Sequence, residues 1–276
     1  MQDIPQILGI VNMTSDSFSD GGLFLDEQSA IAHANGLWKH GANIIDLGPA
    51  ASNPNAELVD SKEEIRRLSP VITVLHKAKI PVSVDSFRAE TQRYAISRGV
   101  EFLNDITGFS EPSIYADLAV AKCKLIVMHS MQAGNRATES DFSPHEVWLH
   151  SFRFFEERIA TLINAGIAPE RLILDPGMGF FLSANPEASL RILANLEDFS
   201  HRFCLPLLIS ASRKSFLRKV TGKAVEKIGS ATLAAELLAA MAGVSYIRTH
   251  DAGALADGLA VLSAVNSNKG HFSSKG

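Results

Sequence analysis

The 276-residue sequence predicts an α/β fold of the TIM (β/α)₈ barrel class, with parallel strands and an active site at the carboxyl-terminal mouth. Eight short apolar runs, rich in β-branched residues, lie along the chain, and their first residues, from 6 to 244, are on average 34 residues apart. That spacing is close to the roughly 31 residues per unit of a 250-residue barrel. The runs are apolar throughout, as strands buried on both faces of a parallel sheet require.

The predicted strands are, in order, QILGIV (6–11), NIIDL (43–47), IPVSV (80–84), VEFLN (100–104), KLIVM (124–128), RLILD (171–175), LPLLIS (205–210) and VSYIR (244–248). Between most of them, apolar residues recur three and four positions apart, which predicts helices. Three clear examples are residues 30–38, residues 65–75 behind a capping box of Ser61 and Glu64, and residues 148–162.

A doubly wound sheet also alternates strands and helices. The polar residues favour the barrel, because nearly every predicted strand runs into a polar or glycine-rich cluster at its carboxyl end. The clusters are NMTSDSFSDGG, GPAASNPN, DSF, NDITGF, HS, DPGMGF, SASRKS and RTHD. In a barrel they all converge on one mouth. No linker divides the chain, so we expect one domain over residues 1–266 and a disordered tail over residues 267–276.

Composition argues against several classes of protein. The 26 Lys and Arg residues against 30 Asp and Glu give a net charge of −4, and the cations are scattered, whereas a nucleic-acid binder carries a basic cluster. Cys123 and Cys204 lack the spacing of a disulfide framework or a zinc site. The N-terminus lacks a basic signal-peptide region, and the apolar segment 231–246 is too short to span a bilayer. We expect a reduced, cytoplasmic protein with no nucleic-acid or membrane partner.

Four polar residues stand at the ends of four different predicted strands: Asp85, Asn104, Asp175 and Lys214. Together they supply two carboxylates, an amide and an ammonium group. An aminopyrimidinone ring presents N–H donors that suit a carboxylate, ring nitrogens that suit an amide, and a carbonyl that suits a lysine. The structural alternative is that each aspartate caps a helix or a turn. The convergence of all four favours a site for a flat polar heterocycle.

A second group lies at the ends of the first and last predicted strands, which are neighbours in a closed barrel: Asn12, Arg248 and His250. An arginine fork, an imidazole and an amide oxygen suit a pyrophosphate with Mg²⁺. A hydrogen-bonded structural histidine is the alternative. SRKSF (212–216) adds two cations where barrels often bind anions, or else forms a solvated basic loop. The sequence has no GxGxxG, Walker A or GxSxG motif.

Six segments, in this order, resemble the motifs of the dihydropteroate synthase family: GIVNMTSDSFSDGG (9–22), VDSF (84–87), NDITGF (104–109), DPGMGF (175–180), SRKSF (212–216) and IRTH (247–250). The resemblance runs from about residue 7 to 263. It implies a barrel, usually a homodimer, that joins 6-hydroxymethyl-7,8-dihydropterin diphosphate to 4-aminobenzoate. The products are 7,8-dihydropteroate and pyrophosphate. A folate-biosynthesis transferase that uses Mg²⁺ is therefore implied.

Matched residue by residue, the resemblance assigns the pterin site to Asp85, Asn104, Asp175 and Lys214. It assigns the diphosphate site to Asn12, Arg248 and His250, with Asn12 as the Mg²⁺ ligand. It assigns the 4-aminobenzoate pocket to Phe180, Lys214, Ser215, Ser52 and Pro54.

Two loops depart from the family pattern. The second loop reads GPAASNPN (48–55) where the family has a sequence close to GGESTRPG, so that Asn53 stands at the place of an arginine, and Ser15 of the first loop replaces a proline. In these features the chain resembles the sulfonamide-insensitive, Sul-type members. Since the pterin, diphosphate and metal residues are all present, we expect a sulfonamide-resistant synthase. Asn53, Phe181 and Phe216 are the residues expected to reshape the 4-aminobenzoate pocket against the drug.

Other interpretations remain open at this point. Within the family they are a pterin-binding homologue without synthase activity and an ordinary sulfonamide-sensitive synthase. A corrinoid-linked pterin methyltransferase shares the barrel and the ring-binding acids, but it has no diphosphate to bind and so does not account for SRKSF and RTH. The small-residue segment LAAELLAAMAG (233–243) suits a dimer contact and packing against the barrel equally well.

Overall fold

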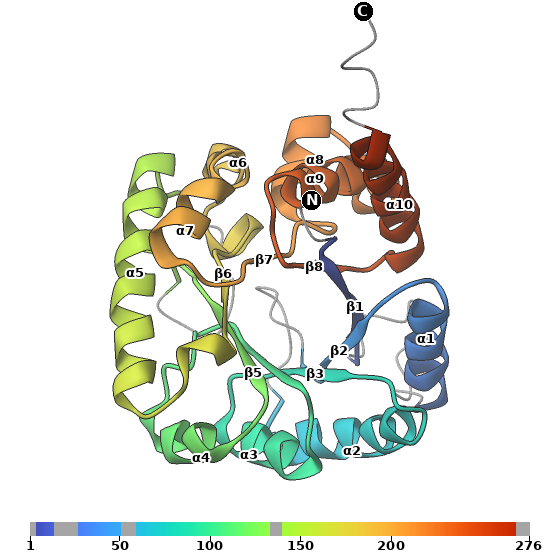
Figure 1. The fold of residues 1–276 in the computed structure, drawn as a ribbon, viewed down its shortest axis with the longest axis vertical. Coiled ribbons are helices and arrows are strands. Elements are labelled where there is room, and N and C mark those ends of the chain that lie inside the picture. Colours follow the sequence, from blue (N-terminus) through green and yellow to red (C-terminus); the bar gives the residue numbers. More distant parts are fainter. Residues whose placement is uncertain (1–3, 14–26, 51–58, 133–139, 269–276) are drawn as a thin grey trace, which may run out of the picture.

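The computed structural model describes residues 4–13, 27–50, 59–132 and 140–268. Eight parallel strands form one sheet inside a ring of helices (Figure 1). They are β1 (Gln6–Asn12), β2 (Ile44–Gly48), β3 (Val82–Asp85), β4 (Phe102–Asp105), β5 (Lys124–Met128), β6 (Leu172–Asp175), β7 (Leu208–Ile209) and β8 (Tyr246–Thr249). All eight predicted strands are present, and the largest difference is in β7, which keeps only two residues of the predicted run 205–210.

The sheet is a closed barrel. Its strand order is β6-β5-β4-β3-β2-β1-β8-β7, so that β1 pairs with β2 on one side and with β8 on the other. Between β6 and β7, Leu174 forms a parallel bridge with Leu207 and its amide donates to the carbonyl of Pro206 at 2.9 Å. The predicted (β/α)₈ barrel is therefore confirmed, and the doubly wound alternative is wrong.

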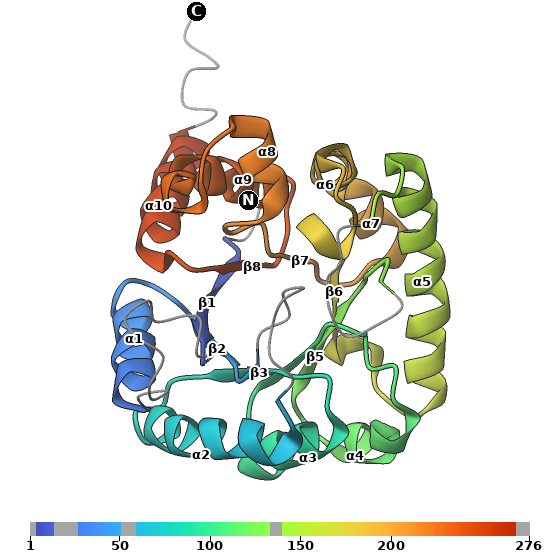
Figure 2. The ribbon, with the colours of Figure 1, turned by 180° about the vertical axis from the view of Figure 1, so that it is seen from behind.

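Helices cover the outside of the barrel in both views (Figures 1 and 2). The α-helices are α1 (Glu27–Lys39), α2 (Ser61–Lys77), α3 (Ala89–Arg98), α4 (Tyr115–Val120), α5 (Pro144–Asn164), α6 (Pro186–Ala194), α7 (Leu196–Phe203), α8 (Ser215–Thr221), α9 (Gly229–Met241) and α10 (Ala252–Asn268). Short 3₁₀ helices lie at η2 (Pro112–Ile114), η3 (Pro169–Arg171), η4 (Gly179–Phe181) and η5 (Val225–Lys227).

The cap of helix α2 differs from the prediction. Asp60 is the N-cap residue, and its Oδ1 accepts a hydrogen bond from the amide of Glu63 at 2.9 Å. A capping box of Ser61 and Glu64 is therefore wrong. Glu64 is buried, and its Oε2 accepts from the hydroxyl of Ser86 at 2.7 Å, so its carboxylate is not available to the start of the helix.

Two layers fill the interior of the barrel. The layer nearer the amino ends of the strands is one apolar cluster of Leu8, Ile44, Phe102, Ile126, Ile173, Leu208 and Tyr246. Alternate residues of a strand point to the same face, so positions two residues further along also face the interior. These positions are mostly polar, and they include Asp46, Asn104, Asp175, Ser210 and Arg248. The apolar layer thus supports a polar layer nearer the carboxyl ends of the strands.

The periphery bears on two further predictions. Helix α10 includes Ser267 and Asn268, which the sequence placed in the tail, and residues 269–276 lie outside the described residues.

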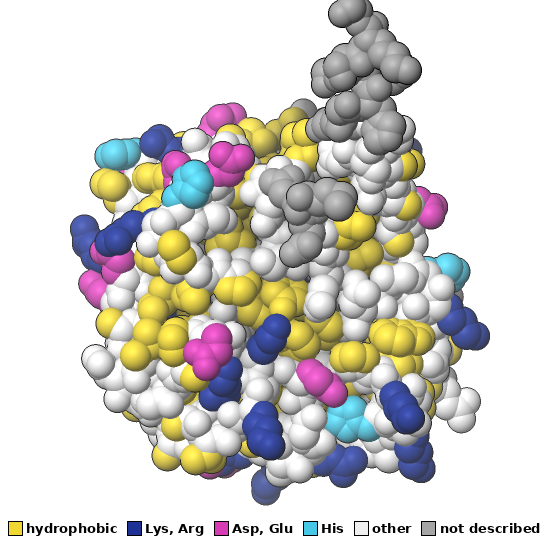
Figure 3. Space-filling model, in the orientation of Figure 1, with side chains coloured by type: hydrophobic (Ala, Val, Ile, Leu, Met, Phe, Trp, Pro, Cys, Tyr) yellow, Lys and Arg dark blue, Asp and Glu magenta, His cyan; other side chains and the backbone are white. Residues whose placement is uncertain are grey.

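Among the helices of the described segments, none is long and apolar enough to cross a membrane. On the face shown in Figure 3, Lys and Arg side chains outnumber acidic ones over the lower half.

Candidate active site

Arg248 on β8 joins two carboxylates of the polar layer. Its Nε donates to Oδ2 of Asp46 at 2.6 Å, and its Nη2 donates to Oδ2 of Asp85 at 2.8 Å. Burial by itself would lower the pKa of Arg248, but Asp46 and Asp85 outweigh it and raise that pKa. The guanidinium therefore stays charged and connects strands β2, β3 and β8.

Burial changes the titration of the predicted heterocycle-binding residues. It raises the pKa of Asp85 to about 7, against the opposing effect of Arg248. It raises the pKa of Asp175 to about 6, against the hydrogen bond from Gly177. Burial, and then Arg248, lower the pKa of Lys214 to about 8, whereas Asp175 and Asp85 oppose this. The structure therefore brings the two acids and the lysine into one electrostatic unit with Arg248.

Several buried polar atoms of the interior have no hydrogen-bond partner within the described part of the chain. They are Asp46 Oδ1, Ser83 Oγ, Asn104 Oδ1 and Ser210 Oγ. Buried polar groups in folded proteins are nearly always paired. Asn104, the predicted amide, lies directly beside Asp85 in the register of β3 and β4. The polar layer thus has unused hydrogen-bonding capacity of the kind that a polar heterocycle would satisfy.

The turn after β6 packs on the start of α8. Gly179 has a positive φ of 67°, and a Cβ there would lie 3.1 Å from Oγ of Ser215 and 3.4 Å from Cβ of Lys214. Phe180, half-buried, follows in η4. The ring centroid of Phe181 lies 5.0 Å from Nζ of Lys214. The predicted 4-aminobenzoate residues Phe180, Lys214 and Ser215 therefore come from two segments in contact.

A cationic group surrounds His250. Its Nδ1 lies 3.0 Å from Oγ of Ser212, and its amide donates to the same oxygen at 3.2 Å. Burial, and then the positive charges of Arg213, Arg248 and Lys214, lower the pKa of His250 to about 3. A neutral imidazole among three cations suits a multiply charged anion. The sequence left open whether Arg213 binds an anion or belongs to a solvated loop. The structure places it in this cationic group.

Asn12 lies at the end of β1. A Cβ on Gly48, its partner in β2, would lie 3.2 Å from the Asn12 side-chain oxygen, so the glycine leaves room for this amide. Within the described residues, no group of three or more His, Cys, Asp or Glu could hold a metal. Mg²⁺ keeps several waters and usually binds one or two protein oxygens together with substrate phosphates. One amide oxygen on β1, the strand that pairs with β8 and its predicted diphosphate residue Arg248, fits that ion.

The residues expected to confer resistance are placed differently from one another. Phe181 packs with Ile106 and Met128 in a small cluster beside Lys214. Phe216 is fully buried in the main hydrophobic core. Asn53, together with the predicted pocket residues Ser52 and Pro54 and with Ser15, lies outside the described residues.

A cavity of about 1020 Å³ lies next to the polar layer. Ile106 and Met128, which pack with Phe181, line it, and so do His150 and Phe154. Its described lining does not include the acids Asp85 and Asp175. The cavity therefore lies beside the candidate site and is not part of it.

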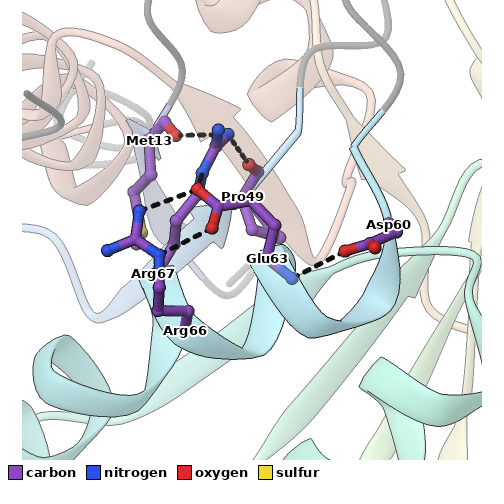
Figure 4. A network of polar contacts seen from close by, with 6 residues as sticks. All are labelled: Met13, Pro49, Asp60, Glu63, Arg66 and Arg67. Carbon is purple, nitrogen blue, oxygen red and sulfur yellow. Dashed lines mark hydrogen bonds and ion pairs between the residues drawn. The ribbon is translucent and has the colours of Figure 1, made fainter. Parts of the chain in front are cut away.

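The sequence analysis missed two residues that shape the site. Asp46 is hidden in the apolar run NIIDL, and counting two positions on from Ile44 would have found it. Arg67 of α2 ties together the ends of β1 and β2 (Figure 4): its Nη1 donates to the carbonyls of Pro49 at 2.7 Å and Met13 at 3.2 Å. Nothing in the sequence links Arg67 to residues 18 and 54 positions away.

Comparisons with known proteins agree with this geometry. The model of the family described as "Pterin binding enzyme" matches residues 8–250. The chain is 53% identical to the dihydropteroate synthase type-2 of Escherichia coli, over 94% of this chain and 95% of that protein. It is 49% identical to dihydropteroate synthase type-3 of the same organism, over 94% and 99%.

A solved structure extends the agreement to three dimensions. The Xanthomonas albilineans dihydropteroate synthase with 4-aminobenzoic acid superposes with a TM-score of 0.87 at 33% identity, covering 96% of this chain and 94% of that one. The barrel fold and the sequence therefore indicate the same family. The chain belongs to the pterin-binding enzymes, and within them to the dihydropteroate synthase family.

Proposed function

We propose that this chain condenses 6-hydroxymethyl-7,8-dihydropterin diphosphate with 4-aminobenzoate to 7,8-dihydropteroate and pyrophosphate. One observation carries the proposal: the buried acids Asp85 and Asp175 share an electrostatic unit with the cations Lys214 and Arg248. A substrate with a ring of N–H donors at one end and a diphosphate at the other needs both kinds of group side by side.

The acids and the amide bind the pterin ring in this proposal. Ionised Asp85 and Asp175 accept hydrogen bonds from ring N–H groups, Asn104 pairs with the ring nitrogens, and Lys214 donates to the ring carbonyl. Since all four residues are fixed on strand ends or the helix start beside them, the ring is oriented before any bond breaks.

The cations serve the leaving group. The bond between the pterin methylene carbon and the diphosphate oxygen breaks, and its electron pair leaves with pyrophosphate. The amine nitrogen of 4-aminobenzoate forms the new C–N bond and then loses a proton. Arg248 and His250 are proposed to bind the diphosphate, with Arg213 adding positive charge at His250. Fixed cations stabilise the charge that develops on the departing oxygen, and no covalent enzyme intermediate is needed.

Mg²⁺ is the proposed metal ion, with the Asn12 amide oxygen as its protein ligand. When bound, the ion would neutralise charge on the diphosphate. Asn12 would then orient this end of the substrate at the end of β1, which pairs with β8, the strand that carries Arg248.

The second pocket is proposed to discriminate between 4-aminobenzoate and sulfonamides. Phe180 and Ser215 would line it with Lys214, together with positions 52 and 54. Phe181 beside Lys214, and Asn53 in place of an arginine, are proposed to reject the larger drug while the carboxylate is accepted. Phe216 would act from the core, by supporting the start of α8.

We further propose a homodimer, a cytoplasmic location and a single domain over residues 1–266. Helix α9 buries Ala235 and Ala239 on the barrel and exposes Leu238 and Met241 on its other side. Val261 and Val265 of the neighbouring α10 are also exposed. An exposed apolar surface on adjacent helices suits a second copy of the chain. Light scattering tests this directly, and Leu238→Glu is expected to give a monomer.

The test of the proposed reaction separates binding from chemistry. Calorimetry measures binding of the dihydropterin diphosphate, and chromatography measures dihydropteroate after addition of 4-aminobenzoate and Mg²⁺. We expect tight binding and product with the wild type, and loss of both with Asp175→Ala. Binding without product would support a pterin-binding homologue that lacks synthase activity.

A further inference from the structure

His129 follows β5, and both nitrogens of its ring have partners. Nδ1 lies 3.0 Å from the carbonyl oxygen of Pro176, and Nε2 lies 2.8 Å from Nδ1 of His150 on α5. The ring is fully buried and packs edge-on against Phe154. The reaction proposed above makes no use of this histidine pair.

The partners fix where the ring hydrogens lie. A carbonyl oxygen can only accept, so Nδ1 of His129 carries a hydrogen and donates to Pro176. Burial lowers the pKa of His129 to about 3, which leaves the ring neutral and Nε2 without a hydrogen. Nδ1 of His150 must then be the donor to Nε2. His129 is therefore held as the Nδ1–H tautomer, with a donor on one side and an acceptor on the other.

Residue 129 contacts the turn after β6 at three points. Its amide donates to the carbonyl of Asp175 at 2.8 Å, its ring reaches Pro176, and its carbonyl oxygen occupies the space that a Cβ on Gly177 would need. The amide of Gly177 in turn donates to Oδ1 of Asp175 at 2.8 Å. The orientation of the Asp175 carboxylate thus depends, through Gly177, on how the turn sits on residue 129.

We propose that His129 is a positioning residue of the synthase: its ring holds the turn 175–177 so that Gly177 occupies one oxygen of Asp175 and the other oxygen is left for the pterin. His150 acts one step further away, by donating from its Nδ1 to Nε2 of His129. The inference rests on the proposed function, because it takes the pterin as the ligand of Asp175.

The pH midpoint of pterin binding distinguishes a positioning histidine from a purely structural one. If the turn moves, Asp175 loses the Gly177 hydrogen bond, which opposes the rise in its pKa. Lys214, Arg248 and Asp46 also act on this carboxylate, and they stay in place when residue 129 is changed. The pH midpoint of pterin binding would therefore move upwards. A loss of stability alone would leave that midpoint unchanged.

The experiment compares His129→Leu, which lacks the ring N–H, with His129→Asn, whose Nδ2 can take the place of Nδ1. Calorimetric titration with dihydropterin diphosphate is expected to show about tenfold weaker binding for the leucine variant and a change within about threefold for asparagine. The pH midpoint is expected to rise only with leucine. His129→Gln, whose amide reaches the Nε2 position, replaces the leucine variant if the latter does not fold.

Two further variants complete the set. His150→Ala removes the partner of Nε2 and keeps the bond to Pro176, so binding is expected to stay within about threefold of wild type. His145→Ala, an exposed histidine in the first turn of α5, is the matched control and is expected to bind as the wild type does. Circular dichroism verifies the fold of each variant.

The outcomes separate this inference from the proposed function. Equal weakening by leucine and asparagine, or undiminished binding by a folded leucine variant, would overturn the role of His129. Ring ¹⁵N NMR tests it without substrate: a hydrogen on Nδ1 and none on Nε2 is expected between about pH 5 and 8, and the opposite tautomer would contradict the inference. A wild type that does not bind dihydropterin diphosphate would count against the proposed function alone.

Discussion

Arg248 and Asp85 form an ion pair in the barrel interior, with Nη2 and Oδ2 2.8 Å apart, although 163 positions separate them in the sequence. The pair joins a residue assigned to the diphosphate with one assigned to the pterin ring. A second carboxylate, Asp46, holds the same guanidinium at 2.6 Å. The two halves of the site are therefore electrostatically coupled, and a change of charge in one is expected to alter binding in the other.

Binding of dihydropterin diphosphate is expected to strengthen as pH rises from about 5 to 8. Asp85 and Asp175 accept N–H groups only when ionised, and burial raises their pKa values to about 7 and about 6. Below these values a proton competes with the ligand, and each protonated acid weakens binding by up to about tenfold per pH unit. Calorimetry across this range measures the effect.

The diphosphate also titrates, so Asp175→Asn serves as the reference for the carboxylate. The variant is expected to bind more weakly at high pH and to lose the transition near pH 6 that the wild type shows. Identical pH profiles for variant and wild type would contradict the assignment of Asp175.

Arg67 and Arg66 offer a matched pair of substitutions. Both form ion pairs with Glu63, but the Arg67 side chain is 11% exposed and also donates to the Met13 and Pro49 carbonyls, whereas Arg66 is 66% exposed (Figure 4). Arg67→Met is expected to lower the free energy of unfolding by about 2 kcal/mol, because two carbonyls lose a charged donor. Arg66→Met is expected to change it by less than about 0.5 kcal/mol.

Urea denaturation of the two variants checks this difference. Activity measured in parallel is expected to fall only with Arg67→Met, since Met13 follows the predicted metal ligand Asn12 directly. Equal stability losses would show that the shared ion pair to Glu63, and not the contacts with the two strand ends, explains the effect.

Glu236 makes the stability pH-dependent. Burial raises its pKa to about 8, against a hydrogen bond with Thr249, while a glutamate in the unfolded chain keeps a pKa near about 4.3. Between these values the folded state holds the extra proton, so stability falls as pH rises, by at most about 1.4 kcal/mol per pH unit. Glu236→Gln removes this contribution. Between about pH 5 and 8, the free energy of unfolding is expected to fall less in the variant than in the wild type. Equal losses would contradict the raised pKa of Glu236.

Phe181→Leu is expected to increase inhibition by sulfamethoxazole while turnover persists. The phenyl ring lies 5.0 Å from the Lys214 ammonium, and a smaller side chain opens space where the drug is proposed to be excluded. Phe216→Leu is the companion variant. Because Phe216 is fully buried, its substitution is also expected to lower the melting temperature. If both variants resist the drug as the wild type does, the pocket explanation fails for these residues.

The fold could be predicted from the sequence because barrel strands are buried on both faces. The run KLIVM is apolar at every position after Lys124, as a strand buried on both faces requires, and β5 has the predicted bounds. The residues at which helices begin are harder to predict, because several neighbouring residues can serve as the N-cap. Asp60 and Ser61 are both good cap residues, and the choice between them follows from the burial of Glu64 against Ser86, which a sequence does not reveal.

The candidate site was predictable only where polar residues follow a strand. Asp85, Asn104 and Asp175 stand at strand ends and are visible there, whereas Asp46 lies within an apolar run. The contacts of Arg67 with Met13 and of His129 with Pro176 cross from one βα unit to another, so they depend on the closed barrel. Sequence spacing carries no information on such contacts. The fold had to be known first.

Dihydropteroate formation by the purified chain, with both substrates and Mg²⁺ and increasing sulfamethoxazole at fixed 4-aminobenzoate, tests the central claim most directly. We predict turnover that persists when the drug is far in excess of 4-aminobenzoate. Turnover abolished by the drug would contradict the proposed discrimination and leave an ordinary synthase. No turnover in a protein that binds the pterin substrate would contradict the proposed reaction itself.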